Sequence, residues 1–128
     1  MWTIECDAGD TRTVQSSEEL EKVLNEIDMV HRANRPVMVN VVSQSGEVLT
    51  IGLGADQSVL SYMPANGEPP YLSSVGNDQS GGTIVFSYFG DWTEIPRTSL
   101  IATPIARQVL RHFVNTGELS NIVTWNDE

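Results

Sequence analysis

Residues 103–117 read Thr-Pro-Ile-Ala-Arg-Gln-Val-Leu-Arg-His-Phe-Val-Asn-Thr-Gly, and this stretch decides much of the fold. Thr103 has the residue type of a helix N-cap, and the fixed φ of Pro104 suits the first helical position. Apolar residues then recur at helical spacing, which predicts one buried face. Gly117 is the residue type that ends a helix in the left-handed conformation. We therefore expect a helix over about 104–116, packed on a sheet.

A second helix is predicted near the start of the chain. Ser16 and Glu19 have the spacing of a capping box, and acidic residues occupy the first turn that follows. The apolar positions that come next at helical spacing are Leu20, Val23, Leu24 and Ile27. This pattern predicts a helix over about 17–31.

The residues before the first predicted helix and between the two helices carry the signals of strands in succession. Alternation at Trp2, Ile4 and Cys6 predicts a strand at the N-terminus, before a turn at residues 7–10. The other strand-like runs are 37–42, 47–53, 58–63, 71–75 and 83–89. Since strands follow one another instead of alternating with helices, we expect an α+β fold. It would be a single domain over 1–128, with a mostly antiparallel sheet of about five or six strands.

Charge is the strongest compositional signal in this chain of 128 residues. Seventeen acidic residues face seven basic ones, giving a formal net charge of −10. Such a surface repels nucleic acid, whose binding depends on Lys and Arg neutralising phosphates. It attracts a basic partner and speeds the encounter with it. Acidity also keeps a protein soluble, so charge alone does not identify a partner.

Several classes of protein are disfavoured by the composition. No apolar run approaches the length of about 18 residues that a membrane span needs, and the first residues lack a secretory signal. Cys6 is the sole cysteine, which excludes an intrachain disulfide and fits a cytoplasmic location. With one cysteine and the isolated His31 and His112, we expect no metal site, no cofactor and no catalytic residues. The chain is therefore not expected to be an enzyme.

What remains is a binding surface on segments that place aromatic residues beside acidic ones. Tyr and Trp are favoured anchors at interfaces, and acids beside them complement a basic groove. The candidate binding residues, in segments 62–79 and 88–94, are Tyr62, Glu68, Tyr71, Asp78, Tyr88, Asp91, Trp92 and Glu94. The alternative is that Tyr88 and Trp92 pack against the second helix while the acids simply face solvent.

The order of residues in the second half resembles a known family. Its features are Tyr62, a Gly-rich turn at 76–82, Ile95-Pro96, Ala106-Arg107, Phe113, Thr116-Gly-Glu118 and Trp125. Over roughly residues 37–125 this order is similar to the first-numbered immunity-protein family of bacterial polymorphic toxin systems. The shared apolar positions, such as Phe113 and Trp125, belong to the core, so the resemblance transfers no binding residues.

The resemblance implies a cytoplasmic antitoxin that binds a cognate secreted toxin and covers its active site. Toxins in these systems include nucleic-acid deaminases, so a cytidine-deaminase-type toxin acting on DNA is the expected partner. Such a toxin needs a basic groove and a pocket for a flipped base, which an acidic protein with an aromatic loop would block. The alternative is a small acidic, non-catalytic domain for ligand binding or assembly. An unpaired edge strand would allow a homo-oligomer, which we do not predict.

Overall fold

The computed structural model describes residues 1–7, 10–32 and 35–127. Within these residues the chain forms a nine-stranded sheet, a two-stranded sheet and two α-helices, which confirms the α+β class. The sheet has more strands than the sequence pattern indicated. The turn expected at residues 7–10 includes Ala8 and Gly9, which lie outside the described residues.

The helical bounds agree closely with the expected ranges. The helices are α1 (Ser17–Arg32) and α2 (Thr103–Thr116), with a short 3-10 helix, η1 (Arg97–Ser99). The strands in chain order are β1 (Trp2–Asp7), β2 (Asp10–Val14), β3 (Val37–Val42), β4 (Val48–Leu53), β5 (Gln57–Ser58), β6 (Leu60–Met63), β7 (Leu72–Val75), β8 (Thr83–Tyr88), β9 (Asp91–Pro96), β10 (Ile101–Ala102) and β11 (Thr124–Asp127).

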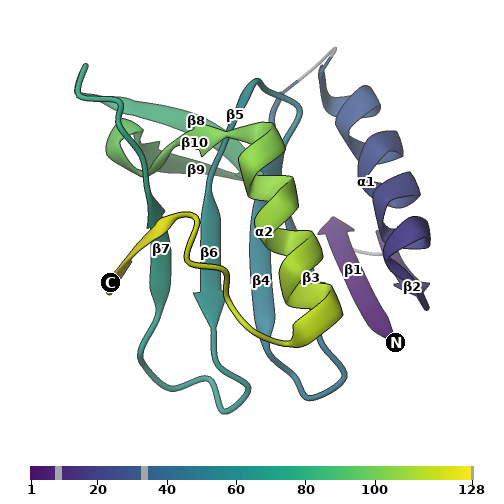
Figure 1. Cartoon of the computed structure of the whole chain (residues 1–128). Helices are drawn as coiled ribbons and strands as arrows, with labels where there is room; N and C mark the ends of the chain where they lie inside the picture. Colours follow the sequence, from purple (N-terminus) through teal and green to yellow (C-terminus); the bar gives the residue numbers. More distant parts are fainter. Residues whose placement is uncertain (8–9, 33–34, 128) are drawn as a thin grey trace.

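The large sheet runs in the order β11-β7-β6-β4-β3-β1-β2, with β8 beside the start of β3 and β9 beside β8. Its neighbours are antiparallel except for the short parallel pairing of β3 with β8. Figure 1 shows α2 in front of this sheet, α1 beside it, and β8 and β9 crossing at the upper end. The separate pair β5–β10 joins this region to the start of α2.

The expected strand count was wrong because β2, β9 and β11 were not recognised as strands. β9 contains acids, a Trp and a Pro, and was interpreted as a loop. Its alternation is nevertheless regular: Thr93 and Ile95 are half-buried while Trp92, Glu94 and Pro96 are exposed. A strand with one exposed face shows only a weak apolar pattern in its sequence. Whether such a segment forms a strand then depends on its pairing partner, which here is β8. The expected strand over 58–63 also divides into β5 and β6.

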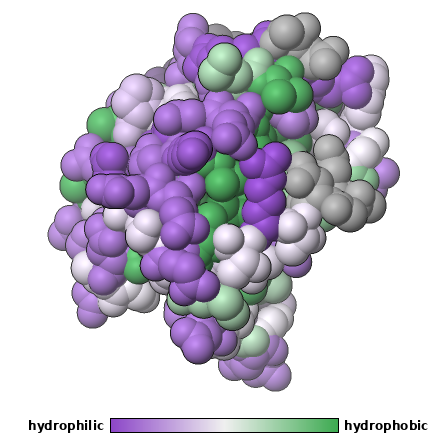
Figure 2. Space-filling view, turned by 90° about the vertical axis from the view of Figure 1, so that its right-hand side faces the viewer, coloured by the Kyte–Doolittle hydropathy of each residue, from purple (hydrophilic) through white to green (hydrophobic). Residues whose placement is uncertain are grey.

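One face of the sheet packs against both helices. Alternate residues of β4, namely Leu49, Ile51 and Leu53, point toward the helices and are fully buried. α1 adds Leu24 and α2 adds Phe113 to the same core. Burial of each such side chain stabilises the folded state by roughly 1.5–3 kcal/mol. Figure 2 looks at the side that carries α1, where polar residues flank a narrow band of hydrophobic ones.

The helix ends follow the local sequence signals with one exception. At α1, the Glu19 N–H donates to Ser16 Oγ at 3.2 Å, and Glu19 Oε2 accepts from the Gln15 N–H at 3.4 Å. Gly117 ends α2 with φ of 77°, as expected. The N-cap of α2 is Ala102 and not Thr103. The Thr103 hydroxyl instead donates to the Ala55 carbonyl at 2.8 Å, which ties α2 to the neighbouring turn.

The opposite face of the sheet is covered at one end by the β8–β9 hairpin. Phe86 of β8 is completely buried and forms a second core with Met38, Val59 and Leu100. It lies directly on Gly52 of β4, where an added Cβ would meet the ring at 2.6 Å. Gly52 is therefore required here for space, since any side chain would displace the hairpin.

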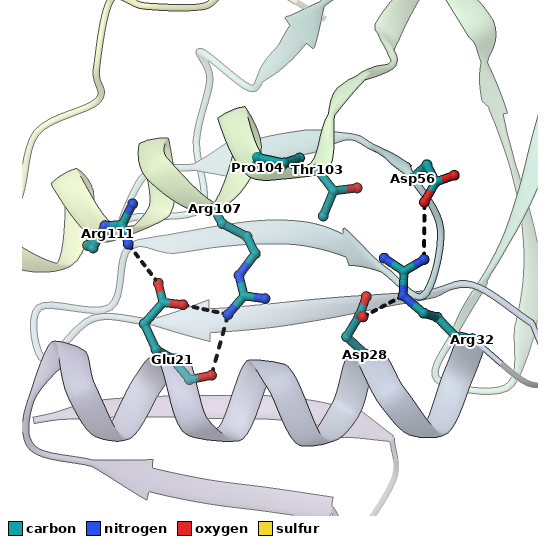
Figure 3. A pocket seen from close by; sticks show the side chains of 8 residues that line it. All are labelled: Glu21, Asp28, Arg32, Asp56, Thr103, Pro104, Arg107 and Arg111. Atoms are coloured by element: carbon teal, nitrogen blue, oxygen red, sulfur yellow. Dashed lines mark hydrogen bonds and ion pairs between the residues drawn. The ribbon is translucent and has the colours of Figure 1, made fainter.

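A charged cleft of about 410 Å³ separates α1 from α2 (Figure 3). Arg107 of α2 reaches across it to Glu21 of α1, with 2.5 Å between Nη2 and Oε2. Arg111 contacts the second oxygen of Glu21 at 3.5 Å. At the other end, Arg32 pairs with Asp28 at 2.7 Å and with Asp56 at 3.1 Å. Glu21 thus links the two helices through a shared carboxylate.

Gly52→Ala should lower the free energy of unfolding by roughly 1–3 kcal/mol, because the new methyl group overpacks against Phe86. Urea denaturation followed by circular dichroism measures the change. The double variant Gly52→Ala/Phe86→Leu should be more stable than the sum of the single effects implies, since the smaller side chain leaves room for the methyl group. Additive effects in this cycle would contradict the close contact.

Glu21→Gln should lower the free energy of unfolding by about 1–2 kcal/mol, because it removes a charge-assisted hydrogen bond and leaves the half-buried Arg107 without its ion pair. Asp56→Asn is the matched control in the same cleft, since the Asp56 side chain is 97% exposed and its ion pair is screened by solvent. Its melting temperature should stay at the wild-type value. Equal melting temperatures for both variants would show that the Glu21 link does not stabilise the helix pair.

Candidate functional site

The tip of the β8–β9 hairpin is the most prominent aromatic feature of the surface. Phe89 and Gly90 form its two-residue turn with φ of 50° and 86°, and this geometry matches the twist of a hairpin. Tyr88 pairs with Asp91 across the turn. The tight turn therefore projects the aromatic residues at a fixed position, on a strand pair anchored by its buried base.

Two aromatic rings are exposed at this tip. Trp92 is 68% exposed, an unusual value for a residue with such a large apolar side chain. Its indole face is covered by Arg35, whose Cζ lies 4.1 Å from the ring centroid. Phe89 packs edge-on against Tyr88 at 4.9 Å between ring centroids. The cation–π contact favours one position of Trp92 and thereby reduces its mobility before any partner arrives.

Acidic residues lie on both sides of the exposed Trp92 in the sequence of β9. Asp91 and Glu94 are both exposed, and neither forms an ion pair with a described residue. By contrast, the arginines in ion pairs with acids are Arg12, Arg32, Arg97, Arg107 and Arg111. Most of the few cationic side chains are thus already neutralised locally, which leaves the acids of β9 available to a basic partner.

The inner side of the hairpin is fixed by a polar network. Asn40 is 8% exposed and donates from Nδ2 to the Tyr88 hydroxyl oxygen at 3.0 Å. Its Oδ1 accepts from the Thr50 hydroxyl at 2.6 Å. Tyr88 is therefore half-buried and bonded to the sheet, and only its neighbours project outward. Its packing partner is the sheet face opposite the helices, which differs from the alternative in which it packs against α2.

Tyr62 lies on the helix side of the sheet, away from the hairpin tip. Its ring packs edge-on against Phe113 at 6.2 Å between centroids, and its hydroxyl donates to Glu47 at 2.7 Å. Burial, aided by the hydrogen bond to the Glu47 carboxylate, raises the pKa of Tyr62 to about 12. Tyr62 is half-buried and still has accessible atoms beside Met63 and Tyr71.

The remaining predicted residues lie in the segments after β6 and β7. Glu68 is exposed, and the half-buried Tyr71 donates its hydroxyl to the Gly67 carbonyl within the same loop. Hydrogen bonds from the side chain and backbone of Ser80 lower the pKa of Asp78, with a smaller effect from Arg97 at 3.9 Å. The predicted residues are thus spread over different parts of the surface, and the three from β9 form the one exposed contiguous group among them.

Elsewhere in the described residues, Cys6 is buried and the charged side chains of the cleft are paired with one another. Within residues 1–7, 10–32 and 35–127, no group of three or more potential ligands is placed to hold a metal ion. Cys6 is buried in the core of the sheet. The charged cleft between the helices has its three arginines paired with its three carboxylates. No helix of the described residues is long and apolar enough to cross a membrane.

Sequence reasoning missed Arg35 and Phe89 as parts of the tip. The sequence does carry a signal for Phe89. Phe89-Gly90 lies between two runs of alternating residues, which is the pattern of a hairpin with a two-residue turn. Arg35 gave no signal, since it lies far from Trp92 in sequence and meets it only through the crossing of β8 over β3.

The chain also matches a known protein family. The chain matches the family model described as immunity protein Imm1 over residues 8–127. No curated protein matches the chain. The match spans both helices and the sheet from β2 to β11, including the β8–β9 hairpin. The protein is therefore a member of the Imm1 immunity protein family.

Proposed function

We propose that this protein is an antitoxin that binds a cognate secreted bacterial toxin and inhibits it by covering its active site. The observation that carries the proposal is the family match over residues 8–127, because an immunity protein acts by binding a toxin. In this proposal the protein works in the cytoplasm as a non-catalytic inhibitor without a cofactor. The family match also favours this function over the alternative of a small ligand-binding or assembly domain.

The proposed toxin is a cytidine-deaminase-type enzyme that acts on DNA. Such an enzyme must present a basic groove to the phosphate backbone and a pocket that admits a flipped base. The net charge of −10 supports this choice, since an acidic protein competes with nucleic acid for the same basic surface. The antitoxin itself does not bind nucleic acid or membrane.

The proposed contact surface is centred on β9. Its exposed residues are Asp91, Trp92 and Glu94. Trp is among the residue types enriched in interface hot spots, and the acids beside it complement a basic surface. Tyr88 supports this group from inside. The other members of the proposed surface are Tyr62 of β6 and three residues between β6 and β8, namely Glu68, Tyr71 and Asp78.

The charge reversal Asp91→Lys/Glu94→Lys should slow association with the toxin domain encoded next to this protein's gene. The reason is that surface charges steer the encounter, so association should also become less sensitive to salt.

Trp92→Ala should mainly raise the dissociation rate, by about tenfold or more, because an aromatic side chain buried in the interface slows dissociation. Surface plasmon resonance at several salt concentrations measures both rates.

Glu18→Lys/Glu118→Lys is the matched control, since both glutamates are exposed on other parts of the surface and the net charge changes equally. This control should slow association less than the β9 double variant does. Unaltered toxin binding in all variants would remove β9 from the contact surface. Failure of the wild-type protein to bind or inhibit the toxin at low salt would overturn the proposed function itself.

A further inference from the structure

The face of the sheet opposite the helices is only partly covered by the β8–β9 hairpin. Beside β9 this face forms a groove of about 490 Å³. Its sheet side includes Thr50, Ser61 and Ser73 from three neighbouring strands, and β9 contributes Thr93 and Ile95. The groove therefore has a strand of the hairpin along one side and the open sheet on the other.

The lining of this groove is unusual for so acidic a protein. Seven of its lining residues carry hydroxyl groups, and none of the described residues that line it is charged. Met38 and Val59 add apolar atoms beside them. Hydroxyl groups both donate and accept hydrogen bonds, so such a surface accommodates uncharged polar groups of either kind. The groove thus suits neutral side chains and not basic ones.

The backbone of β9 presents free hydrogen-bonding groups next to the groove. The Ser87 N–H donates to the Pro36 carbonyl at 2.8 Å, away from β9. The Ser87–Trp92 pair is therefore a non-hydrogen-bonded pair of the ladder, and Trp92 and Glu94 direct their N–H and C=O groups away from β8. In the described part of the chain, β9 pairs with β8 alone. This edge is open to a further strand.

We propose that an extended segment of the toxin adds to the free edge of β9 as a new antiparallel or parallel strand and fills the groove with its inward side chains. Backbone hydrogen bonds to Trp92 and Glu94 would hold the segment, as in other cases of strand addition. This inference rests on the proposed function and names the part of the partner that is recognised.

The geometry also defines the residue pattern of that segment. Side chains alternate between the faces of a strand, so every second residue of the toxin segment faces the groove and must be small and uncharged. The residues between them lie on the outer face beside Glu94, where a Lys or Arg forms a favourable cross-strand pair. The recognised segment thus alternates basic residues with small neutral ones.

Glu94→Pro tests the strand addition directly, with Glu94→Ala as its matched control. Both variants lose the carboxylate, but only proline removes the outward N–H, and it does so without breaking a bond to β8. Glu94→Pro should dissociate from the toxin domain about tenfold faster than Glu94→Ala.

Ser73→Lys tests the groove, because it places a long charged side chain there, and it should weaken binding by at least about tenfold. Gln108→Lys on the exposed side of α2 is its control.

Melting temperatures identify any variant that fails to fold, and Ser73→Lys carries the test if Glu94→Pro is unstable. Binding of Glu94→Pro and Ser73→Lys at the level of their controls, together with a normal wild-type complex, would overturn the strand addition and leave the proposed function intact. If the wild-type protein forms no complex with the toxin domain, both proposals are overturned.

Discussion

The contact of Phe86 with Gly52 is the constraint on which the rest of this structure depends. A two-stranded hairpin has little stability by itself and needs an apolar surface to pack against. Phe86 supplies that contact, and the missing side chain at Gly52 lets the ring lie against the strand. The hairpin is thereby held across one end of the sheet. Its aromatic tip, its free edge and the groove beside it all follow from this position.

As a result, the two faces of the sheet are covered to different extents. The face toward the helices is closed, with Val39, Ile51 and Phe113 fully buried between strands and helices. The opposite face has a small core only where the hairpin crosses it, and hydroxyl residues line the groove beyond. Burial on the first face stabilises the fold, so the residues of the second face are less constrained by packing.

The sequence alone predicted the helices well because their signals are local. The capping residues Ser16 and Glu19, the apolar stripe of α2 and the left-handed Gly117 act within a few residues of one another. β9 was missed because its stability comes from pairing with β8 and from the burial of Phe86 beneath the hairpin, which no local pattern in Asp91–Pro96 reveals. Long-range pairing therefore accounts for the errors in strand number.

The contrast between local sequence signals and long-range pairing also applies to the candidate site. The acids and the Trp of β9 are candidates that their residue types alone suggest, because the sequence shows residue types directly. The placement of the aromatic residues was not predictable, since Tyr62 faces the helices through Phe113 while Tyr88 is bonded to Asn40 on the other face. Arg35 joins Trp92 only because β8 lies beside the start of β3. Residue type suggests which side chains can bind, and topology decides which of them meet.

Charge and shape would contribute to toxin binding at different distances. Electrostatic attraction acts over about 8–10 Å at physiological salt and draws any basic surface toward the acidic protein, so it raises the association rate with little discrimination. Discrimination requires contacts that form only after water has left the interface, such as backbone hydrogen bonds along β9 and the fit of side chains in the neutral groove. A groove without charge is suited to this second task, because it imposes no cost of burying an unpaired ion. With its acids, Asp91 and Glu94, outside the neutral groove, the protein would therefore find its toxin quickly and still release basic surfaces that do not fit.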